Sequence, residues 1–523
     1  MNRTTMSLIA TVVALAAVTG VATLTDPAGS SDGPAAAAVR LPVDRSTVLC
    51  PAPSSSDLAE TTYTAYTPEG TDGPDGPGAG GKGAAAAAKE KDGTAELLPA
   101  ASAAAEDGTT GEEDDAGEDR EASAADEPVA PLKKPGTPVT ATTDDSEAPA
   151  LIGEAGGRLA PGWSVQQTTT VDAGVGRGLL GSSCAAPDTD FWFPAVSTAS
   201  DRQDYIHLTN PDSRSAVVDL EMFGAEGEVG DEDGEAIKVP GRSTVPVLLS
   251  TLTEQPEINV TLHVTVRSGR VGAAVQASDT NLGGDWLPAS AAPAPSLVFP
   301  GIPKDATAVR LVAYAPGEDA DLRVRLAGPT GSITPAGNAS LHVKGRMTAA
   351  LDLGDITKGE PGSLVLTPES PASGKPVVAA LRVTRGKGDK QETAFIPATS
   401  AIDERGTVAD NRAKGSTLSL VAPEGTAKVR VTASATTEGG AAVRKTYTVK
   451  GGTTMAVDGL RPAGDKGTYG LSVEHLSGGP VHAARILALP RDGVPMFTVQ
   501  TLPDDGGTVE VPEAEQDLSL LNH

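Results

Sequence analysis

The sequence predicts an all-β protein in which antiparallel β-sandwiches of immunoglobulin- or fibronectin-like shape follow one another about every 105 residues. Two short patterns each recur at this interval. Apolar and polar residues alternate with a period of two, and helical caps with helical spacing are absent beyond the N-terminal segment. These observations indicate tandem copies of one small domain, which favours a binding or spacing array over a single catalytic pocket. The first marker is VPGRST at 239–244, VKGRMT at 343–348 and VKGGTT at 449–454, with a fainter KPGT at 134–137; the second is SGRV at 268–271, SGKP at 373–376 and SGGP at 477–480.

The strands follow the same order in each copy. One strand of the third copy alternates apolar and charged residues, as expected for a strand with one buried and one wet face. An earlier strand ends at a proline, which stops further pairing. A late strand is largely apolar, which predicts a central strand covered on both faces. The alternating strand covers residues 321–326; the proline-ended strands are 205–211, 309–316 and 417–423; the apolar strands are 271–277, 377–383 and 481–487.

These strands divide the chain into six parts. A unit of about 105 residues is long enough to bury its own core, so we expect a rod of independently cored modules. The parts are a signal peptide or signal anchor (1–38), a degenerate first β-sandwich (39–189), three further β-sandwiches (190–295, 296–404 and 405–512) and a tail (513–523).

The first sandwich carries a predicted insertion at residues 68–130. It contains a turn-rich run at 73–78, five alanines at 84–88 and an acidic stretch at 112–121. With few large apolar side chains and many like charges, this segment cannot bury enough surface to offset its ordering entropy. We expect a disordered acidic loop. A functional spacer or cation buffer is the alternative.

The N-terminus has the features of an export signal. A short positive start, Met1-Asn2-Arg3, precedes an uncharged apolar run at 8–24 and a small, polar stretch that ends at Ala38. The run is also just long enough to be an uncleaved anchor. In either case we expect an extracytoplasmic protein, secreted or held on the outer face of the plasma membrane.

The two cysteines, Cys50 and Cys184, are predicted to form a disulfide, because a pair in an exported chain is most simply bonded. It would join the first strand of the first copy to its last. Two unpaired buried thiols are the alternative. A metal site is disfavoured, since no histidine clusters with these cysteines.

Composition narrows the classes of partner. The formal net charge of −28 repels nucleic acid and anionic lipid surfaces, so we expect no nucleic-acid partner and membrane contact only through the N-terminal segment. Aromatic residues make up 3% of the chain, which is few for an enzyme cleft or a sugar-stacking platform. Rings near the joints at 191–195, 286–289 and 395–398 are interpreted as plugs at the ends of the sandwiches.

A search for catalytic and metal motifs gives no committed site, so we expect no enzyme activity, no cofactor and no metal. GSSDG at 29–33 matches a hydrolase pattern but lacks the strand-to-helix elbow that it needs. The segment 231–235 (DEDGE) could bind calcium, although Asp-Gly is also usual at a hairpin tip. A pair of carboxylates for glycan cleavage stays open, because spacing through space is invisible in a sequence. The histidines are interpreted as ordinary surface residues: His207, His263, His342, His475 and His482.

Three short segments carry a resemblance to a known family. MNRTT at 1–5, STVLCP at 46–51 and LTNP at 208–211 resemble exported actinobacterial, Streptomyces-like proteins that are classed as a domain of unknown function. The resemblance implies an extracytoplasmic location and a class of exported protein, and it identifies no catalytic residues. We therefore expect a non-enzymatic cell-envelope scaffold that contacts an extracytoplasmic protein or a cell-wall glycan. The alternatives are a polysaccharide-binding accessory of envelope glycan assembly and a glycan hydrolase with an unrecognised carboxylate pair.

Overall fold

The computed structural model describes residues 39–70, 93–103, 127–230, 232–370, 374–463 and 466–511. The fold is all-β, which confirms the predicted class, and the helical elements of these residues are 3-10 turns of three residues. These turns are η2 (Gly157–Leu159), η3 (Glu232–Gly234) and η4 (Leu249–Thr251). In the described residues, no helix is long and apolar enough to cross a membrane. The predicted signal (1–38) and tail (513–523) lie outside them.

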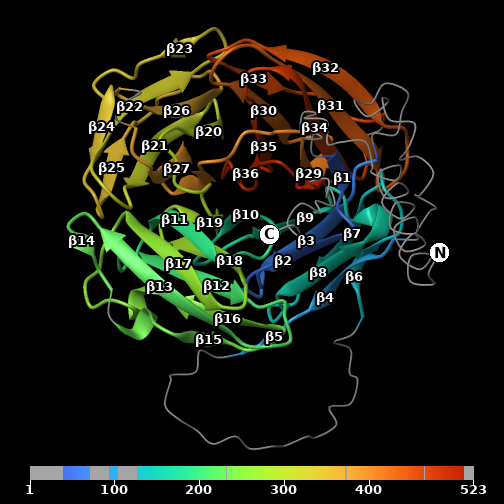
Figure 1. Cartoon of the computed structure of the whole chain (residues 1–523), viewed down its shortest axis with the longest axis horizontal. Coiled ribbons are helices and arrows are strands. Elements are labelled where there is room, and N and C mark those ends of the chain that lie inside the picture. Colours follow the sequence, from blue (N-terminus) through green and yellow to red (C-terminus); the bar gives the residue numbers. More distant parts are fainter. Residues whose placement is uncertain are drawn as a thin grey trace, which may run out of the picture. The chain divides into compact units, whose positions relative to one another are not determined.

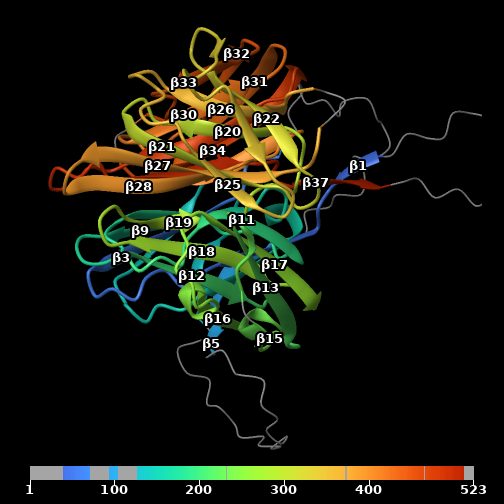
Figure 2. The ribbon, with the colours of Figure 1, turned by 90° about the vertical axis from the view of Figure 1, so that its left-hand side faces the viewer.

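The chain divides into two compact units. The smaller unit contains both ends of the chain, and its described part is a two-stranded antiparallel sheet, whose strands β1 and β37 are labelled in Figure 2. Strand β1 (Val39–Pro42) pairs there with β37 (Thr508–Val511). The larger unit, residues 43–507, contains eight further sheets that pack in pairs as four β-sandwiches.

Sandwich one combines the sheets β2-β8-β4-β6 and β10-β9-β3-β7. The strands of both sheets contribute to one core that contains the disulfide cysteines. Their bounds are β2 (Arg45–Cys50), β3 (Ala59–Tyr66), β4 (Ala95–Pro99), β6 (Val129–Leu132), β7 (Val139–Thr143), β8 (Leu151–Gly156), β9 (Ser164–Val171) and β10 (Gly178–Ser183).

Sandwich two combines β11-β17-β13-β14, with β15 also on β13, and β19-β18-β12-β16. A short strand from the sandwich-one segment, β5 (Ala101–Ser102), adds in parallel to β16. The bounds are β11 (Asp190–Val196), β12 (Arg202–Thr209), β13 (Ala216–Gly224), β14 (Gly227–Glu228), β15 (Ile237–Val239), β16 (Ser243–Leu248), β17 (Val260–Ser268), β18 (Gly272–Asp279) and β19 (Gly283–Leu287).

Sandwiches three and four repeat this plan (Figure 1). Sandwich three combines β20-β26-β22-β23, with β24 on β22, and β25-β21-β27-β28; sandwich four combines β29-β34-β31-β32 and β33-β30-β35-β36. The bounds are β20 (Leu297–Ile302), β21 (Ala306–Tyr314), β22 (Ala320–Ala327), β23 (Ser332–Ile333), β24 (Ser340–Val343), β25 (Thr348–Asp352), β26 (Gly362–Pro368), β27 (Val378–Lys387), β28 (Lys390–Pro397), β29 (Arg405–Arg412), β30 (Ser416–Ala422), β31 (Ala427–Thr436), β32 (Val443–Val449), β33 (Thr453–Val457), β34 (Thr468–Gly478), β35 (His482–Ala488) and β36 (Phe497–Leu502).

The first recurring motif forms a tight turn before β16, β25 and β33. A Cβ atom on the motif glycine would overlap a backbone carbonyl oxygen of a neighbouring loop, so only glycine fits. The following residue has a positive φ in all three copies, which places it in the left-handed region. The glycines are Gly241, Gly345 and Gly451, against Ser213, Gly317 and Gly425.

The last residue of the motif joins neighbouring sandwiches. The Thr348 hydroxyl donates to the Phe223 carbonyl oxygen of sandwich two at 2.7 Å. Thr454 makes the equivalent bond to the Ala327 carbonyl oxygen of sandwich three, also at 2.7 Å. The 105-residue period therefore marks both a turn within each copy and a contact with the copy before it.

Each sandwich has its own main core, but the four sandwiches do not form the predicted rod. Strand β10 contacts β19, β19 contacts β28, β28 contacts β36, and β36 contacts β10, so the four sandwiches form a closed cycle. Neighbouring sandwiches also share their cores. Phe395 of sandwich three belongs to the core cluster of sandwich two, and Phe497 of sandwich four belongs to that of sandwich three. The outer faces of β27 and β35 are buried by these neighbours, in accordance with their apolar sequences.

The rings near the joints take part in this closure. Trp286 of sandwich two packs on Val171 and Leu180 of sandwich one, and Trp192 stacks with Tyr314 of sandwich three at 5.5 Å between ring centroids. These rings therefore fill the junctions between sandwiches, whereas the sequence interpretation placed each at the end of its own sandwich.

The prediction of disorder across residues 68–130 is wrong for part of that range. Strand β4 pairs with both β6 and β8, and Leu97 is fully buried in the core of sandwich one. The short sequence AELLP alternates buried and less buried residues, but it lies between low-complexity stretches that hid it. The run at 84–88 and the acidic stretch at 112–121 lie outside the described residues.

Candidate functional site

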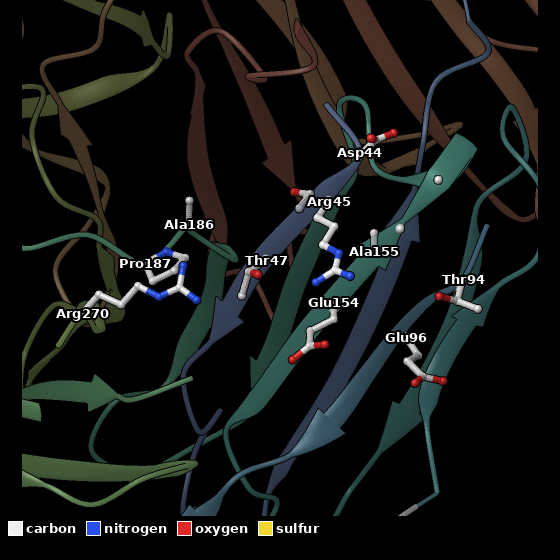
Figure 3. A pocket seen from close by; sticks show the side chains of 13 residues that line it. Asp44, Arg45, Thr47, Thr94, Glu96, Glu154, Ala155, Ala186, Pro187 and Arg270 are labelled. Carbon is white, nitrogen blue, oxygen red and sulfur yellow. The ribbon is translucent and has the colours of Figure 1, made fainter. Parts of the chain in front are cut away.

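A cleft of about 1050 Å³ opens beside sandwich one, and we call it the polar cleft (Figure 3). Its floor is the outer face of β2, β8 and β4. One wall is the segment after β10, and the far side is Arg270, in the turn that precedes β18 of sandwich two. The lining residues include Asp44, Arg45, Ser46, Thr47, Thr94, Glu96, Glu154, Ala186, Pro187 and Arg270.

Strand pairing places three cleft side chains in one row. Glu154 of β8 is the register partner of Thr47 on β2 and of Glu96 on β4. Partners in register project to the same face of a sheet, and Figure 3 shows these side chains projecting from adjacent strands. The adjoining positions Val48 and Leu97 point the other way and are buried in the core. The alternation in these two strands thus separates the core from the floor of the cleft.

The cleft mixes positive and negative charges. Glu154 lies 3.8 Å from the guanidinium of Arg242, and Arg270 forms two hydrogen bonds with Asp212, at 3.0 and 3.2 Å. Arg45 is exposed on the floor. The cleft thus offers guanidinium donors, carboxylate acceptors and hydroxyl groups, and no aromatic ring lies among its lining residues. Such a surface can hydrogen-bond a hydrophilic ligand along several strands.

The disulfide holds one wall of the cleft in place. Cys50 ends β2 and is bonded to Cys184, whose Cα atom lies 4.5 Å away. Two backbone hydrogen bonds between Leu49 and Ala185, at 2.8 and 3.1 Å, continue this contact. Ala186 and Pro187, which line the cleft, follow directly. The structure therefore contains the predicted disulfide, which connects the first and last strands of sandwich one.

A known protein family matches the central part of the chain, including part of the polar cleft. A family of unknown function (DUF5719) matches residues 139–459. The chain belongs to this family. No curated protein matches the chain. Part of the cleft floor, on β2 and β4, precedes the DUF5719 match, whereas Glu154 and Arg270 lie within it. The actinobacterial origin stays a prediction.

Two histidines of this DUF5719 member are not the surface residues that the sequence indicated. His207 on β12 is buried against Trp286, and burial lowers its pKa to about 4, with Gln276 acting in the opposite direction. His482 on β35 is buried as well, and its pKa is lowered to about 4 mainly by desolvation. Trp286, which covers His207, lies on β19 of the same sandwich, and His482 Nδ1 lies 3.0 Å from the Thr399 carbonyl oxygen, which precedes sandwich four.

The other predicted histidines do not form a common site. His342 is exposed and lies 2.7 Å from Asp321, and His475 donates to the Gly479 carbonyl oxygen at 3.1 Å. His263 is half-buried; it stacks on Trp192 at 3.6 Å between ring centroids and bonds Glu221 at 3.0 Å. These side chains belong to different sandwiches or different sheets.

The calcium alternative at 231–235 also stays a prediction. Asp231 lies outside the described residues, and the residues after it form the 3-10 turn η3. Glu235 pairs with Arg267 at 3.2 Å, so its carboxylate already has a cationic partner.

The central strands hold buried carboxyl groups that the sequence analysis missed. Asp285 on β19 accepts hydrogen bonds from the Gly181 amide at 2.9 Å and from the Thr498 hydroxyl at 3.0 Å. Desolvation raises the pKa of Asp285 well above its usual range. Glu392 on β28 is fully buried, and burial raises its pKa to about 8. Each of these carboxyl groups accepts an amide hydrogen bond from β10 of sandwich one, so they connect different sandwiches.

Proposed function

We propose that this DUF5719 member is a non-enzymatic, exported protein of the cell envelope that serves as a β-sandwich interaction platform outside the membrane. The closed cycle of four sandwiches carries the proposal. Shared cores restrain each sandwich on two sides, so the connecting loops and the polar cleft occupy fixed positions. Fixed binding surfaces suit a protein that positions partners, because a preorganised surface loses less entropy on binding.

The disulfide supports the proposed extracytoplasmic location. Bonds between cysteines persist in oxidising compartments and are rare in the cytosol, and the bond here closes a loop of 134 residues. Export through the N-terminal segment would bring Cys50 and Cys184 into such a compartment. Cleavage of that segment and its use as an anchor stay as alternatives.

A specific observation favours a second function, binding of an envelope polysaccharide. The polar cleft is open, wide and lined by side chains that hydrogen-bond hydroxyl groups. It also places Glu96 and Glu154 opposite each other on adjacent strands. Glu154 is exposed and Glu96 is half-buried, and both lie on the open floor of the cleft, whereas glycan cleavage places its acid in an enclosed apolar environment. The arrangement therefore favours retention of a glycan over its cleavage.

Site-directed cross-linking in cells tests the platform proposal. A photoreactive residue at the exposed cleft position Ala186 should capture a defined envelope component in the extracytoplasmic fraction. The matched control is Ile333, which is 57% exposed on sandwich three, away from the cleft lining. Equal capture at both positions, or recovery of the protein in the cytosol, would contradict the proposal.

Retention on purified wall polysaccharide tests the second function. Arg45→Ala should weaken retention, while Arg214→Ala, an exposed arginine outside the cleft lining, should not. Shortening of the glycan during incubation, lost in Glu154→Gln, would instead establish the hydrolase alternative. A protein that passes through the column without delay has no such binding function.

A further inference from the structure

A second pocket lies at the junction of sandwiches two and three, and we call it the arginine pocket. Its volume is about 350 Å³, at the lower end of the range for small-molecule sites. Three arginines line it, each from a different strand: Arg202 on β12, Arg310 on β21 and Arg382 on β27. All of them fall within the part of the chain that matches DUF5719.

Two of these arginines face each other directly. Arg310 is the register partner of Arg382 across the β21–β27 pair. Like charges opposite each other on one face of a sheet destabilise the pair. Burial lowers the pKa of Arg382, and the charges of Arg202 and Arg310 lower it further, with Asp279 and Asp204 offsetting part of this effect.

The arginines differ in how their guanidinium groups are satisfied. Arg202 donates to both carboxylate oxygens of Asp204, at 3.0 and 2.7 Å. Arg310 donates to Asp352 at 2.8 Å and to Asn259 Oδ1 at 2.6 Å. No group of the described residues forms a hydrogen bond or an ion pair with the guanidinium of Arg382. The Arg382 guanidinium is half-buried and carries five N–H donors, so it can accommodate an anionic acceptor.

The rest of the lining limits what that partner can be. Asp204 and Asp352 pair with two of the three arginines, and Asp201 and Asp279 also line the pocket, so Arg382 is the one lining guanidinium that no carboxylate of the described residues contacts directly. A single available guanidinium suits a monoanion better than a phosphate dianion. Ile258, which is 60% exposed, and Leu282 provide an apolar rim. Next to this rim, Asn259 adopts a φ of 60°, in the left-handed region that asparagine tolerates, and its Oδ1 accepts the hydrogen bond from Arg310.

We propose that the arginine pocket binds a small organic carboxylate, which Arg382 holds through two parallel hydrogen bonds while Ile258 and Leu282 contact its aliphatic part. Arginine is suited to this role because its planar fork matches the geometry of a carboxylate. Binding would also neutralise the charge that now opposes Arg310. The site is separate from the polar cleft and does not depend on the function proposed for it.

Calorimetric titration of the full-length protein tests the proposal with two carboxylates, N-acetylleucine and glucuronate. Their neutral counterparts, N-acetylleucinamide and glucose, serve as controls at the same ionic strength. At least one acid should bind saturably, and its neutral counterpart should not. Binding of N-acetylleucine alone indicates an amino acid or peptide end as the source, and binding of glucuronate alone indicates a sugar acid. Absence of binding by both acids overturns the proposal.

Variants separate a binding arginine from a structural one. Arg382→Gln should weaken binding of the acid at least tenfold, whereas Arg214→Gln on the exposed surface should leave it unchanged. Without ligand, Arg382→Gln should unfold at the same temperature as the wild type or a higher one, because the repulsion from Arg310 is removed. A lower unfolding temperature with undiminished binding would refute the role of Arg382.

A second variant keeps the test independent of Arg382. Ile258→Asp places a negative charge at the exposed rim, where the side chain is not needed for packing. It should weaken binding of the acid and leave the unfolding temperature unchanged. Undiminished binding in this variant would place the acid elsewhere on the protein and overturn the proposal.

Discussion

Replacing Glu392 by glutamine should change how the stability of this protein depends on pH. The Glu392 carboxyl is fully buried where β28 meets β10, and its Oε1 accepts the Leu179 amide hydrogen bond at 2.9 Å. The nearest cation is the Arg177 guanidinium, whose Nη2 lies 4.0 Å from Oε2 and donates to the Gln391 carbonyl oxygen at 2.6 Å. Burial therefore outweighs the attraction of Arg177 and raises the pKa of Glu392 to about 8.

The magnitude follows from proton linkage. The folded state keeps a proton that the unfolded state releases above its usual pKa of 4.5, so Glu392 destabilises the fold progressively as the pH rises from 4.5 to 8. At about 1.4 kcal/mol per pKa unit, the loss is about 2 kcal/mol at pH 6 and approaches about 5 kcal/mol at pH 9. Glutamine resembles the protonated acid and does not titrate. Glu392→Gln should therefore match the wild type at pH 4.5 and become increasingly more stable than it above that pH.

Urea unfolding of both proteins at pH 5, 7 and 9 measures this difference. Both proteins retain Asp285, but the charge of Glu392 contributes to the raised pKa of Asp285, so the difference at each pH reports Glu392 together with its coupling to Asp285. Glu96→Gln, on the floor of the polar cleft, is the matched control for loss of a carboxyl group outside the junctions between sandwiches. Parallel curves for Glu392→Gln and the wild type would show that Glu392 is ionised in the folded state, and the argument from burial would fail.

Three further perturbations test the disulfide, the repeated turn and the closed cycle. Replacing Cys50 and Cys184 by alanine should cost up to about 5 kcal/mol of unfolding free energy, since the bond closes a loop of 134 residues; denaturant titration measures it, and an unchanged midpoint would contradict the entropic argument. Gly345→Ala should lower the unfolding temperature, because the new methyl group would overlap the Gly317 carbonyl oxygen, whereas Gly317→Ala enters open space and should be tolerated. Deleting residues 405–507 should leave an aggregating product in size-exclusion chromatography, because it exposes core faces of sandwiches one and three; a soluble, folded remainder would restore the independent-module interpretation.

The fold class could be predicted because its determinants are local. Alternation at residues 321–326 shows in sequence which face of β22 is buried, and the motif glycine at 345 marks a turn that excludes every other residue. The disulfide followed from the count of cysteines and their predicted compartment. Strand β4 was missed because five residues between low-complexity stretches give too short a pattern to recognise.

The closure and both pockets could not be predicted in the same way. They depend on contacts between copies, whereas the sequence of each copy by itself predicts an ordinary β-sandwich. The apolar sequences of β27 and β35 indicated that both faces of these strands are buried. They did not indicate that a neighbouring sandwich buries the outer face. Glu96 and Glu154 are 58 positions apart in the chain and become neighbours only through strand register.

The junctions between sandwiches bury polar side chains that would be exposed to water in an isolated sandwich. Two of these side chains, Glu392 and Arg382, should affect stability in different ways, one with pH and the other with added carboxylate. Glu392 accepts one backbone hydrogen bond and is isolated by packing, so the effect of Glu392→Gln should depend on pH and not on any added acid. Arg382 lines a pocket and faces another arginine, so the effect of Arg382→Gln should depend on the added carboxylate and change little between pH 5 and 9, since its guanidinium stays charged throughout. If both residues served only to pack the junctions, the added carboxylate would change the stability of neither variant relative to the wild type. A carboxylate that stabilises the wild type and Glu392→Gln equally, and Arg382→Gln not at all, would show that one junction is a binding site and the other a structural joint.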